Sequence, residues 1–303
     1  MLLVNKVIIS GASGYFGKLA TYYLEESGVK VLSAGRAANS DIHFDLDFAV
    51  DFASTKISEN IDAFIHAAAT HEVDCVNYPY KCVSRNVAGT RAALDFCVNN
   101  GIKTFIYIST FHVYGTDVGI ISEQTPPKPN HDYGLTHLQA EEYVRMYTRK
   151  GLINGISVRP SNMFDLPISL DDFNRWSLIP FGFCKSAVND GEIVLKTTGM
   201  QERNFVSVRD IVKVIKMIFN NKLTFDVINI PGVSTYSIRD FANMVKRIML
   251  EEFSKSVEVI VPEGGLQNNV LTYMSNYFKP DDLEFLHIED HVINFCKELI
   301  KND

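Results

Sequence analysis

The stretch Gly11-Ala-Ser-Gly14-Tyr-Phe-Gly17 follows an apolar run, Lys6–Ser10, and precedes a helical pattern, Lys18–Ser27. Glycines at this spacing let a backbone turn tightly and approach a pyrophosphate, while the helix N-terminus offers free N–H groups and a partial positive charge. The strand–turn–helix context distinguishes such a loop from a chance glycine triplet. We therefore expect a dinucleotide site, with cofactor contacts from Gly11, Ser13, Gly14, Tyr15, Phe16 and Gly17.

Outward from this loop, short apolar runs alternate with helical patterns up to about residue 160. This alternation is typical of βαβ units and a parallel sheet. The further strands that we expect are Val29–Ala34, Ala63–Ala67, Thr104–Ser109 and Ile156–Arg159, and the further helices are Val83–Asn100 and Leu135–Lys150. The fold class is thus α/β, with a Rossmann-type doubly wound parallel sheet.

The alternation loosens after Arg159. Polar composition, or enrichment in Pro, Gly or Asn, indicates long loops at Thr116–Asp132, Asp165–Ile179 and Pro262–Lys279. Two capping boxes, which begin at Ser207 and Ser237, predict later helices. We expect residues 1–160 to form the dinucleotide-binding domain and 161–303 to form mainly a smaller substrate-binding lobe, with about 204–230 returning to the first domain.

Composition restricts the class of protein. The chain has 303 residues and a net charge of −7, which argues against nucleic-acid binding because that needs a clustered basic surface. The five cysteines contain no C-x-x-C pair, so we expect neither a disulfide framework nor a metal site, and a reduced cytoplasmic location. No apolar segment approaches the roughly 18 residues that a membrane span needs, and the first apolar run indicates a buried strand rather than a leader.

The choice of cofactor depends on the end of the second strand. A site that prefers NAD places Asp or Glu there, against the ribose 2′-hydroxyl, whereas this chain has Ala34-Gly35-Arg36. A guanidinium suits a 2′-phosphate, so Arg36 indicates NADP, with NAD as the alternative if Arg36 is only a solvated strand end. Asp45 and Leu46 would lie near the adenine, unless Asp45 simply begins a turn.

Further motifs follow in a fixed order. They are Ile65-His-Ala-Ala-Ala69, Asn86-Val-Ala-Gly-Thr90, Tyr107-Ile-Ser-Thr-Phe-His-Val-Tyr-Gly115, Tyr133-Gly-Leu-Thr-His137, Val158-Arg-Pro-Ser-Asn162 and Arg203-Asn-Phe-Val-Ser-Val-Arg-Asp210. With the Gly11 loop, their order and spacing resemble the extended short-chain dehydrogenase/reductases, the NAD-dependent epimerase/dehydratase family that modifies nucleotide sugars. The resemblance covers essentially the whole chain.

The resemblance implies roles for several residues. Tyr133 would exchange a proton with a sugar hydroxyl or ketone, and Thr110 would hydrogen-bond the same oxygen. Asn162 and Arg203 would hold the substrate diphosphate, for which a guanidinium has matching geometry. The cofactor would be lined by Ala67, Ala68, Ala69, Asn86 and His137. Family members commonly form homodimers through the helix that carries Tyr133 and the one over Val83–Asn100, which implies a homodimer here.

His137 departs from the family pattern, which has lysine at the fourth residue after the tyrosine. The lysine lowers the tyrosine pKa from its ordinary value of about 10, whereas a neutral imidazole donates a hydrogen bond but adds no full charge. Oxidation of a sugar alcohol needs tyrosinate, whereas reduction of a ketone needs the neutral phenol. His137 therefore favours a reductase, and it also fits a protein that has lost catalysis.

His112 is a second departure, because related dehydratases carry a glutamate there. Without that carboxylate we do not expect 4,6-dehydration. A histidine near neutral pH could act as an acid or base during epimerisation, or could only hydrogen-bond a sugar hydroxyl of the substrate. We expect His66 and His131 to be structural.

Three functions remain open at this stage. The first is an NADPH-dependent reductase of a nucleotide-linked 4-keto sugar, with epimerisation through His112 as an addition. The second is a nucleotide-sugar 4-epimerase or dehydrogenase with bound NAD(P), which would need tyrosinate. The third is a non-catalytic protein that senses a dinucleotide, which would give no reason to keep Thr110, Asn162 and Arg203 together.

Overall fold

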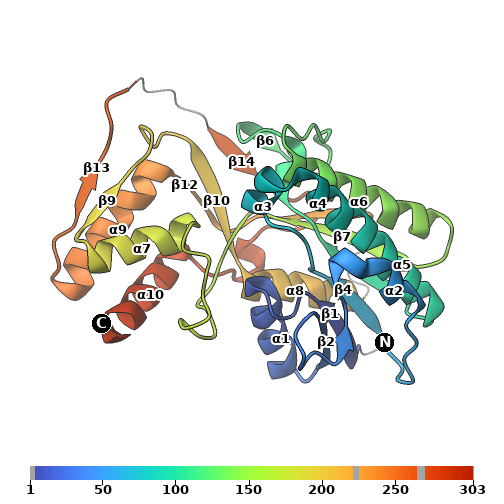
Figure 1. Cartoon of the computed structure of the whole chain (residues 1–303). Helices are drawn as coiled ribbons and strands as arrows, with labels where there is room; N and C mark the ends of the chain where they lie inside the picture. Colours follow the sequence, from blue (N-terminus) through green and yellow to red (C-terminus); the bar gives the residue numbers. More distant parts are fainter. Residues whose placement is uncertain (1–3, 221–224, 265–269, 303) are drawn as a thin grey trace.

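A parallel sheet of seven strands lies at the centre of the larger part of the molecule (Figure 1). The computed structural model describes residues 4–220, 225–264 and 270–302. In spatial order the strands are β11 (Val227–Ile230), β7 (Asn154–Pro160), β5 (Thr104–Ile108), β4 (Ala63–His66), β1 (Lys6–Ser10), β2 (Lys30–Gly35) and β3 (Ile42–His43). The order reverses direction between β1 and β4, and ligands of such sheets bind at this switch point, beyond the carboxyl ends of the strands.

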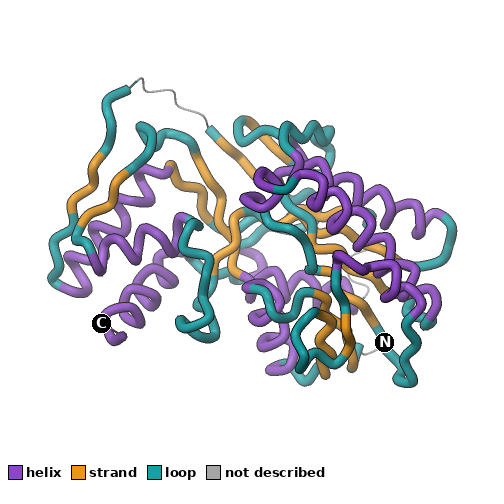
Figure 2. Tube along the Cα trace, in the orientation of Figure 1, coloured by secondary structure: helices purple, strands orange, loops and turns teal. Residues whose placement is uncertain are grey.

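Helices cover both faces of the sheet (Figure 2). On one face, α1 (Tyr15–Glu26) and α8 (Val208–Phe219) pack together over an aliphatic core. On the other face lie α2 (Ala49–Ser54), α5 (Gly89–Asn99) and α6 (Asp132–Arg149), over a core rich in phenylalanine. The doubly wound Rossmann-type fold predicted from the sequence is confirmed.

A smaller lobe lies on the left in Figure 1. It contains α7 (Ile179–Asn189), α9 (Ile238–Phe253), α10 (Ile288–Asn302) and the paired strands β9 (Glu192–Val194) and β13 (Glu258–Ile260). Buried aromatic rings, among them Phe181, Phe241 and Phe295, fill its core. This core is separate from the two cores of the sheet, so the lobe is held together by its own packing.

One strand, β10 (Glu202–Ser207), connects the two parts. It pairs with β8 (Asn162–Phe164) and with β12 (Ser234–Ser237). Above the sheet, β14 (Leu271–Tyr273) pairs with β6 (Gly119–Ile121). Two elements that follow residue 160 in the chain belong to the larger part: β11 is a strand of the sheet, and α8 packs on its face.

Both predicted capping boxes are present. Ser207 Oγ accepts the N–H of Asp210 at the start of α8, and Ser237 Oγ accepts the N–H of Asp240 at the start of α9. The expected strands agree with the observed ones to within two residues at each end. The Thr116–Asp132 and Pro262–Lys279 loops contain β6 and β14, although residues 265–269 of the latter lie outside the described residues.

The prediction of one helix over Val83–Asn100 was wrong in detail. The helical segment begins earlier, with α4 (Pro79–Val83), and passes through a π-helical turn, Ser84–Ala88, into α5. Such turns widen a helix locally and occur often at functional sites. The turn places Asn86 inside the protein, where it is almost fully buried.

The cysteines also differ from the expectation of no disulfide framework, because one pair is bonded. Cys75, in α3 (Glu72–Asn77), and Cys82, in α4, form a disulfide, with their Cα atoms 5.0 Å apart. The two short helices fold back on each other around Tyr78, so a spacing of seven residues brings the thiols together. The other three cysteines are buried thiols.

No helix among the described residues has the length and apolar character needed to cross a membrane.

Candidate active site

The glycine loop has the shape that a pyrophosphate needs. Gly11 has a φ of +73°, and a Cβ there would lie 2.9 Å from the backbone nitrogen of Ala68. A Cβ on Gly17 would lie 2.2 Å from the carbonyl oxygen of Gly11, so only glycine lets α1 approach the loop this closely. The loop therefore fits a dinucleotide, as its sequence predicts.

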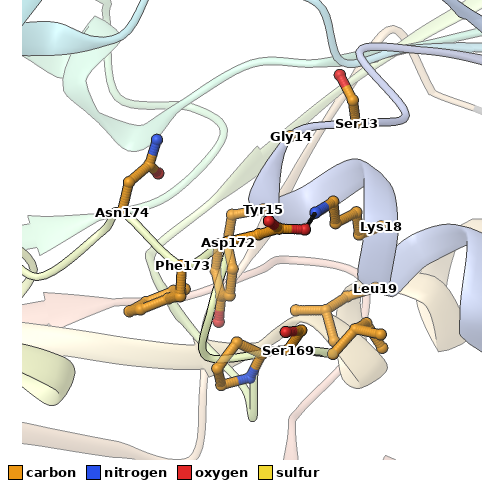
Figure 3. Close-up of a pocket in the computed structure, with 11 residues that line it drawn as sticks. Ser13, Gly14, Tyr15, Lys18, Leu19, Ser169, Asp172, Phe173 and Asn174 are labelled. Atoms are coloured by element: carbon orange, nitrogen blue, oxygen red, sulfur yellow. Dashed lines mark hydrogen bonds and ion pairs between the residues drawn. The ribbon is translucent and has the colours of Figure 1, made fainter. Parts of the chain in front are cut away.

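The side chains of the loop point in different directions. Ser13 and Gly14 are exposed and line a pocket at the start of α1, which is bordered on the other side by Ser169, Asp172 and Asn174 (Figure 3). The Phe16 side chain is buried in the sheet core, so this residue has only its backbone to offer a cofactor. The Tyr15 hydroxyl donates to the carbonyl oxygen of Asp165, 3.0 Å away.

The ends of β1 and β4 are joined by a polar network. Ser10 Oγ accepts the N–H groups of Ala67 and Ala68 at 3.2 Å and lies 2.7 Å from His66 Nδ1. The other ring nitrogen of His66 bonds the hydroxyl of Thr90. His66 is therefore structural, as expected. Ala67 and Ala68 are half-buried, and Ala69 is exposed.

Arg36 lies exposed immediately after β2, beside a carboxylate. Two hydrogen bonds of 2.6 Å from Arg85 to Asp47 are the main reason that the pKa of Asp47 is lowered, and the charge of Arg36 adds to this effect. Asp45 accepts the N–H of Asp47 and thereby caps a 3₁₀ turn, Leu46–Phe48, so it does begin a turn. Arg85 is a cation at this edge that our sequence analysis did not single out.

Tyr133 and Thr110 meet at the carboxyl end of β5. Thr110 begins the 3₁₀ turn Phe111–Tyr114, and Tyr133 lies in the first turn of α6, which His131 caps by accepting the N–H of Gly134. Burial raises the pKa of the Tyr133 phenol above its ordinary value, against the lowering effects of Arg175 and of a hydrogen bond with Thr110. The structure thus brings the predicted pair together, and the capping bond gives His131 the structural role that we expected.

His137 lies one turn further along α6, with its ring centroid 4.5 Å from that of Tyr133. Its Nδ1 is 2.7 Å from the Tyr107 hydroxyl, whereas its buried Nε2 has no partner among the described residues. Burial lowers the pKa of His137 to about 3, so the ring is neutral at neutral pH. An unpartnered buried nitrogen beside Tyr133 fits the ribose contact that the resemblance implies for this position.

Asn86 joins α6 to the segment after β4 through buried hydrogen bonds. Its side-chain amide donates to Thr136 Oγ1 at 3.0 Å, and its carbonyl oxygen accepts the N–H of Thr70 at 2.7 Å. The same amide lies 3.4 Å from Cys82 Sγ. With these bonds made inside the protein, a direct contact between Asn86 and a cofactor stays a prediction.

The His112 ring packs edge-on against that of Tyr133, with 5.8 Å between the ring centroids. Burial, with smaller contributions from His131 and Arg203, lowers the pKa of His112 to about 4. Arg203 on β10 forms an ion pair with Asp117 at 2.7 Å. Asn162 is held on the neighbouring strand β8 and donates to the carbonyl oxygen of Asn204. The residues predicted to hold the diphosphate therefore lie on paired strands.

A buried ion pair anchors α6 further along the helix from Tyr133. Arg159 donates through Nε and Nη2 to Glu141, at 2.8 and 2.5 Å, and Glu141 also accepts the hydroxyl of Ser109. Sequence reasoning missed Glu141, although its position eight residues after Tyr133 places both on one face of the helix. A buried charge without a partner lowers stability. Glu141 of α6 must therefore stay in contact with Arg159 of β7 and with Ser109 after β5, which fixes the position of the helix relative to these two strands.

The family follows from these features and from sequence comparison. Residues 7–230 match the NAD dependent epimerase/dehydratase family, so the chain belongs to this family, which consists of enzymes of the extended short-chain dehydrogenase type. The dTDP-D-glucose 4,6-dehydratase of Dictyostelium discoideum is 25% identical over 82% of this chain and 63% of its own length. The uncharacterized UDP-glucose epimerase YtcB of Bacillus subtilis is 26% identical over 65% of this chain and 61% of its own length. The matches thus cover less than two thirds of these relatives.

Solved structures share the fold along the whole chain. A UDP-N-acetylglucosamine 4-epimerase from Methanobrevibacter ruminantium M1, in complex with UDP-N-acetylmuramic acid, has a TM-score of 0.80 at 20% identity, and the match covers 99% of both chains. RMD from Pseudomonas aeruginosa, complexed with NADPH, also has a TM-score of 0.80, at 16% identity, over 99% of this chain and 100% of that one.

Proposed function

We propose that the chain is an NADPH-dependent reductase of a nucleotide-linked 4-keto sugar. The observation that carries this proposal is that the buried imidazole of His137, in place of a lysine ammonium, lies beside Tyr133, with 4.5 Å between the ring centroids. The pKa of Tyr133 is raised, so the phenol keeps its proton, and the pKa of His137 is lowered to about 3, so the ring adds no positive charge. A protonated phenol is an acid, which a ketone reduction needs, whereas oxidation of an alcohol needs a base.

In this proposal each residue has one task. Tyr133 donates its proton to the carbonyl oxygen of the sugar, and the Thr110 hydroxyl hydrogen-bonds the same oxygen. When bound, the cofactor supplies the hydride that adds to the carbonyl carbon. His137 Nε2 donates a hydrogen bond to the nicotinamide ribose, and Arg203 with Asn162 holds the diphosphate. The product is the alcohol, with one hydride on carbon and one proton on oxygen.

The exposed guanidinium of Arg36 beyond β2 supports NADPH over NADH, because it suits a 2′-phosphate. A relative in complex with NADPH shares the fold. We also propose a homodimer through α5 and α6 and a cytoplasmic location, with residues 161–303 contributing most of the substrate-binding lobe.

A nucleotide-sugar 4-epimerase with bound NAD(P) is the second candidate. Named relatives support it, among them a UDP-glucose 4-epimerase of Streptomyces lividans, 29% identical over 46% of this chain. The placement of His112 across from Tyr133 also supports it, because a neutral imidazole could take a proton from carbon beside a keto group. A protein that binds dinucleotide without turnover is the remaining alternative.

The test is a panel of 4-keto-6-deoxy nucleotide sugars incubated with NADPH or NADH. A reductase consumes NADPH in proportion to the alcohol formed, and Tyr133→Phe loses roughly 10²-fold or more of the rate while still binding NADPH. Interconversion of UDP-sugar epimers without net consumption of cofactor would instead identify the epimerase. Tight binding of NADPH with no turnover of any compound would contradict both enzymatic proposals.

A further inference from the structure

His137 is joined to the sheet through one of its two ring nitrogens. Its Nδ1 lies 2.7 Å from the hydroxyl of Tyr107 in β5, and both side chains are almost fully buried. The other ring nitrogen, Nε2, is also buried and has no partner in the part of the chain that the structure describes. The two nitrogens of an imidazole are separated by one carbon, so the contact with Tyr107 also determines where Nε2 lies.

The position of Tyr107 is fixed by the sheet. Its strand lies between β4 and β7, and the residue is opposite His66 in the register of β4. The rings of Tyr107 and His66 stack, with 5.8 Å between their centroids. The His66 ring is in turn held by Ser10 at one nitrogen and by Thr90 at the other. The Tyr107 hydroxyl is therefore a fixed point that orients the His137 ring.

The surroundings of Tyr107 show where its hydrogen lies. Two groups contact the hydroxyl, His137 Nδ1 and the side chain of Thr90. Thr90 Oγ1 donates its own hydrogen to the carbonyl oxygen of Asn86 at 2.6 Å, so it accepts the hydrogen of His66 Nε2, which is 3.1 Å away. An imidazole nitrogen is a stronger base than an alcohol oxygen, and a phenol is a stronger acid than an alcohol. The Tyr107 hydroxyl therefore donates to His137 Nδ1.

This bond decides which nitrogen of His137 carries a hydrogen. Burial raises the pKa of Tyr107, so the phenol keeps its hydrogen, and burial lowers the pKa of His137 to about 3, so the ring is neutral at neutral pH. A neutral imidazole has one donor nitrogen and one acceptor nitrogen, and the bond at one nitrogen determines the role of the other. Because Nδ1 accepts, Nε2 is the donor. A buried donor without a partner is rare in proteins, unless a ligand supplies the acceptor.

We infer that Tyr107 is a positioning residue, whose hydroxyl holds His137 in the tautomer with the hydrogen on Nε2 and so directs this N–H to an oxygen of a ligand. The inference rests on the proposed function for the identity of that oxygen, a hydroxyl of the nicotinamide ribose. A lysine at position 137 would need no such partner, because each hydrogen of an ammonium can be donated. A histidine donates from Nε2 only while Nδ1 remains an acceptor, and Tyr107 keeps it so.

The tautomer of His137 is measured directly by nitrogen NMR of the full chain with isotope-labelled histidine. The resonances of His137 are those that disappear in His137→Gln. In the unchanged protein we expect a hydrogen on Nε2 and none on Nδ1, with the Nδ1 resonance displaced by an accepted hydrogen bond. A hydrogen on Nδ1 would contradict the inference, whether or not any variant folds.

Tyr107→Phe removes the donor and keeps the ring. In this variant the Nδ1 resonance should move towards that of a nitrogen without a hydrogen bond, and the ring should populate both tautomers. The dissociation constant for NADPH, measured by fluorescence titration, should rise roughly two- to tenfold, the range for the loss of one neutral hydrogen bond.

The matched control is Tyr273→Phe. The Tyr273 hydroxyl donates to the carbonyl oxygen of Arg159, also at 2.7 Å, and this side chain is buried as well. The control thus loses a phenol hydrogen bond of the same length, but it should leave the His137 resonances and the dissociation constant for NADPH unchanged. Equal effects of the two variants, or no effect of Tyr107→Phe, would overturn the inference.

Turnover separates this inference from the proposed function. With a keto-sugar substrate, Tyr107→Phe should raise the KM for NADPH and leave the KM for the sugar nearly unchanged. If the NMR and binding results are as expected but no sugar of the panel is turned over, the role of Tyr107 stands and the proposed reduction fails. If NADPH is consumed by a keto sugar but the hydrogen of His137 lies on Nδ1, the reverse holds.

Discussion

At the scale of single residues, Arg36 tests the choice of cofactor. Its guanidinium is exposed beyond β2, and we propose that it binds the 2′-phosphate of NADP(H). Arg36→Gln should lower kcat/KM for NADPH roughly tenfold or more, since hydrogen bonds to charged groups contribute about 1.5–3 kcal/mol. The value for NADH should change little. Equal losses with both cofactors in steady-state kinetics would remove Arg36 from this role.

Asp117 is a second residue whose replacement should change the KM for the nucleotide sugar in a predictable direction. Its carboxylate is 2.7 Å from Arg203 Nη1, and a substrate diphosphate would compete with it for the same guanidinium. Asp117→Asn keeps the shape and removes the charge, so the KM for the nucleotide sugar should fall roughly two- to fivefold, the range of a partly exposed ion pair. A higher KM in initial-rate measurements would mean that Asp117 orients Arg203 for the substrate.

A site residue could be predicted from the sequence where it lies in a short local motif. The glycine loop, Tyr133 and Thr110 lie in short motifs, and the structure brings each of them to the expected edge of the sheet. Arg175 lies in a loop without a motif, so its electrostatic effect on Tyr133 could not be predicted from the sequence. The partners of Asn86 could not be predicted either, because they come from elements up to 50 residues away.

At the scale of elements, uninterrupted apolar runs were sufficient to find five of the seven strands of the sheet, β1, β2, β4, β5 and β7. Each strand of this kind is apolar on both faces, which marks it even without its neighbours. The edge strands β3 and β11 and the π-helical turn between α4 and α5 were not predicted as such, because none of them has a distinct local pattern. The bounds of α6 were predicted to within three residues; the helix begins earlier than expected, after His131, whose side chain accepts the N–H of Gly134.

The disulfide between α3 and α4 gives a prediction at the same scale. After unfolding without a reductant, an alkylating agent should modify Cys97, Cys184 and Cys296 only, and all five cysteines after reduction, as read by mass spectrometry. Cys82→Ser should lower the free energy of unfolding by about 2 kcal/mol in oxidising buffer, as expected for a short closed loop, and should have little effect in reducing buffer. Modification of all five without reductant would show that the pair is reduced in solution.

At the scale of the whole molecule, buried histidines make stability depend on pH. Burial lowers the pKa of His66, His137 and His291 to about 3. Because these values lie below the ordinary value of about 6.5, each neutral ring contributes stability that is complete above pH 6.5 and is lost as the pH falls from there towards 3. At pH 5 the loss is about 2 kcal/mol for each group, at about 1.4 kcal/mol per pH unit.

His291 offers a clean check of this prediction, because it lies in α10, away from the proposed active site. Its Nε2 has no partner among the described residues, and its ring packs between Phe164, Phe181 and Phe295. Chemical denaturation should show that, between pH 6.5 and 5, the unfolding free energy of His291→Phe falls less steeply than that of the unchanged protein. The difference in slope should correspond to about one proton fewer taken up on unfolding. An unaltered slope would mean that His291 does not titrate in this way.

Adjacent residues of β10 belong to different hydrophobic cores: Phe205 to that of the smaller lobe and Val206 to that of the sheet. Neighbouring side chains of a strand point to opposite sides, so this one strand is shared by both halves of the molecule. Pulling the lobes apart would expose one of the two side chains to water. A chain cut at residue 160 would lose α8 and β11 and would expose the part of the sheet core that α8 covers, so we expect the two lobes to unfold as one cooperative unit.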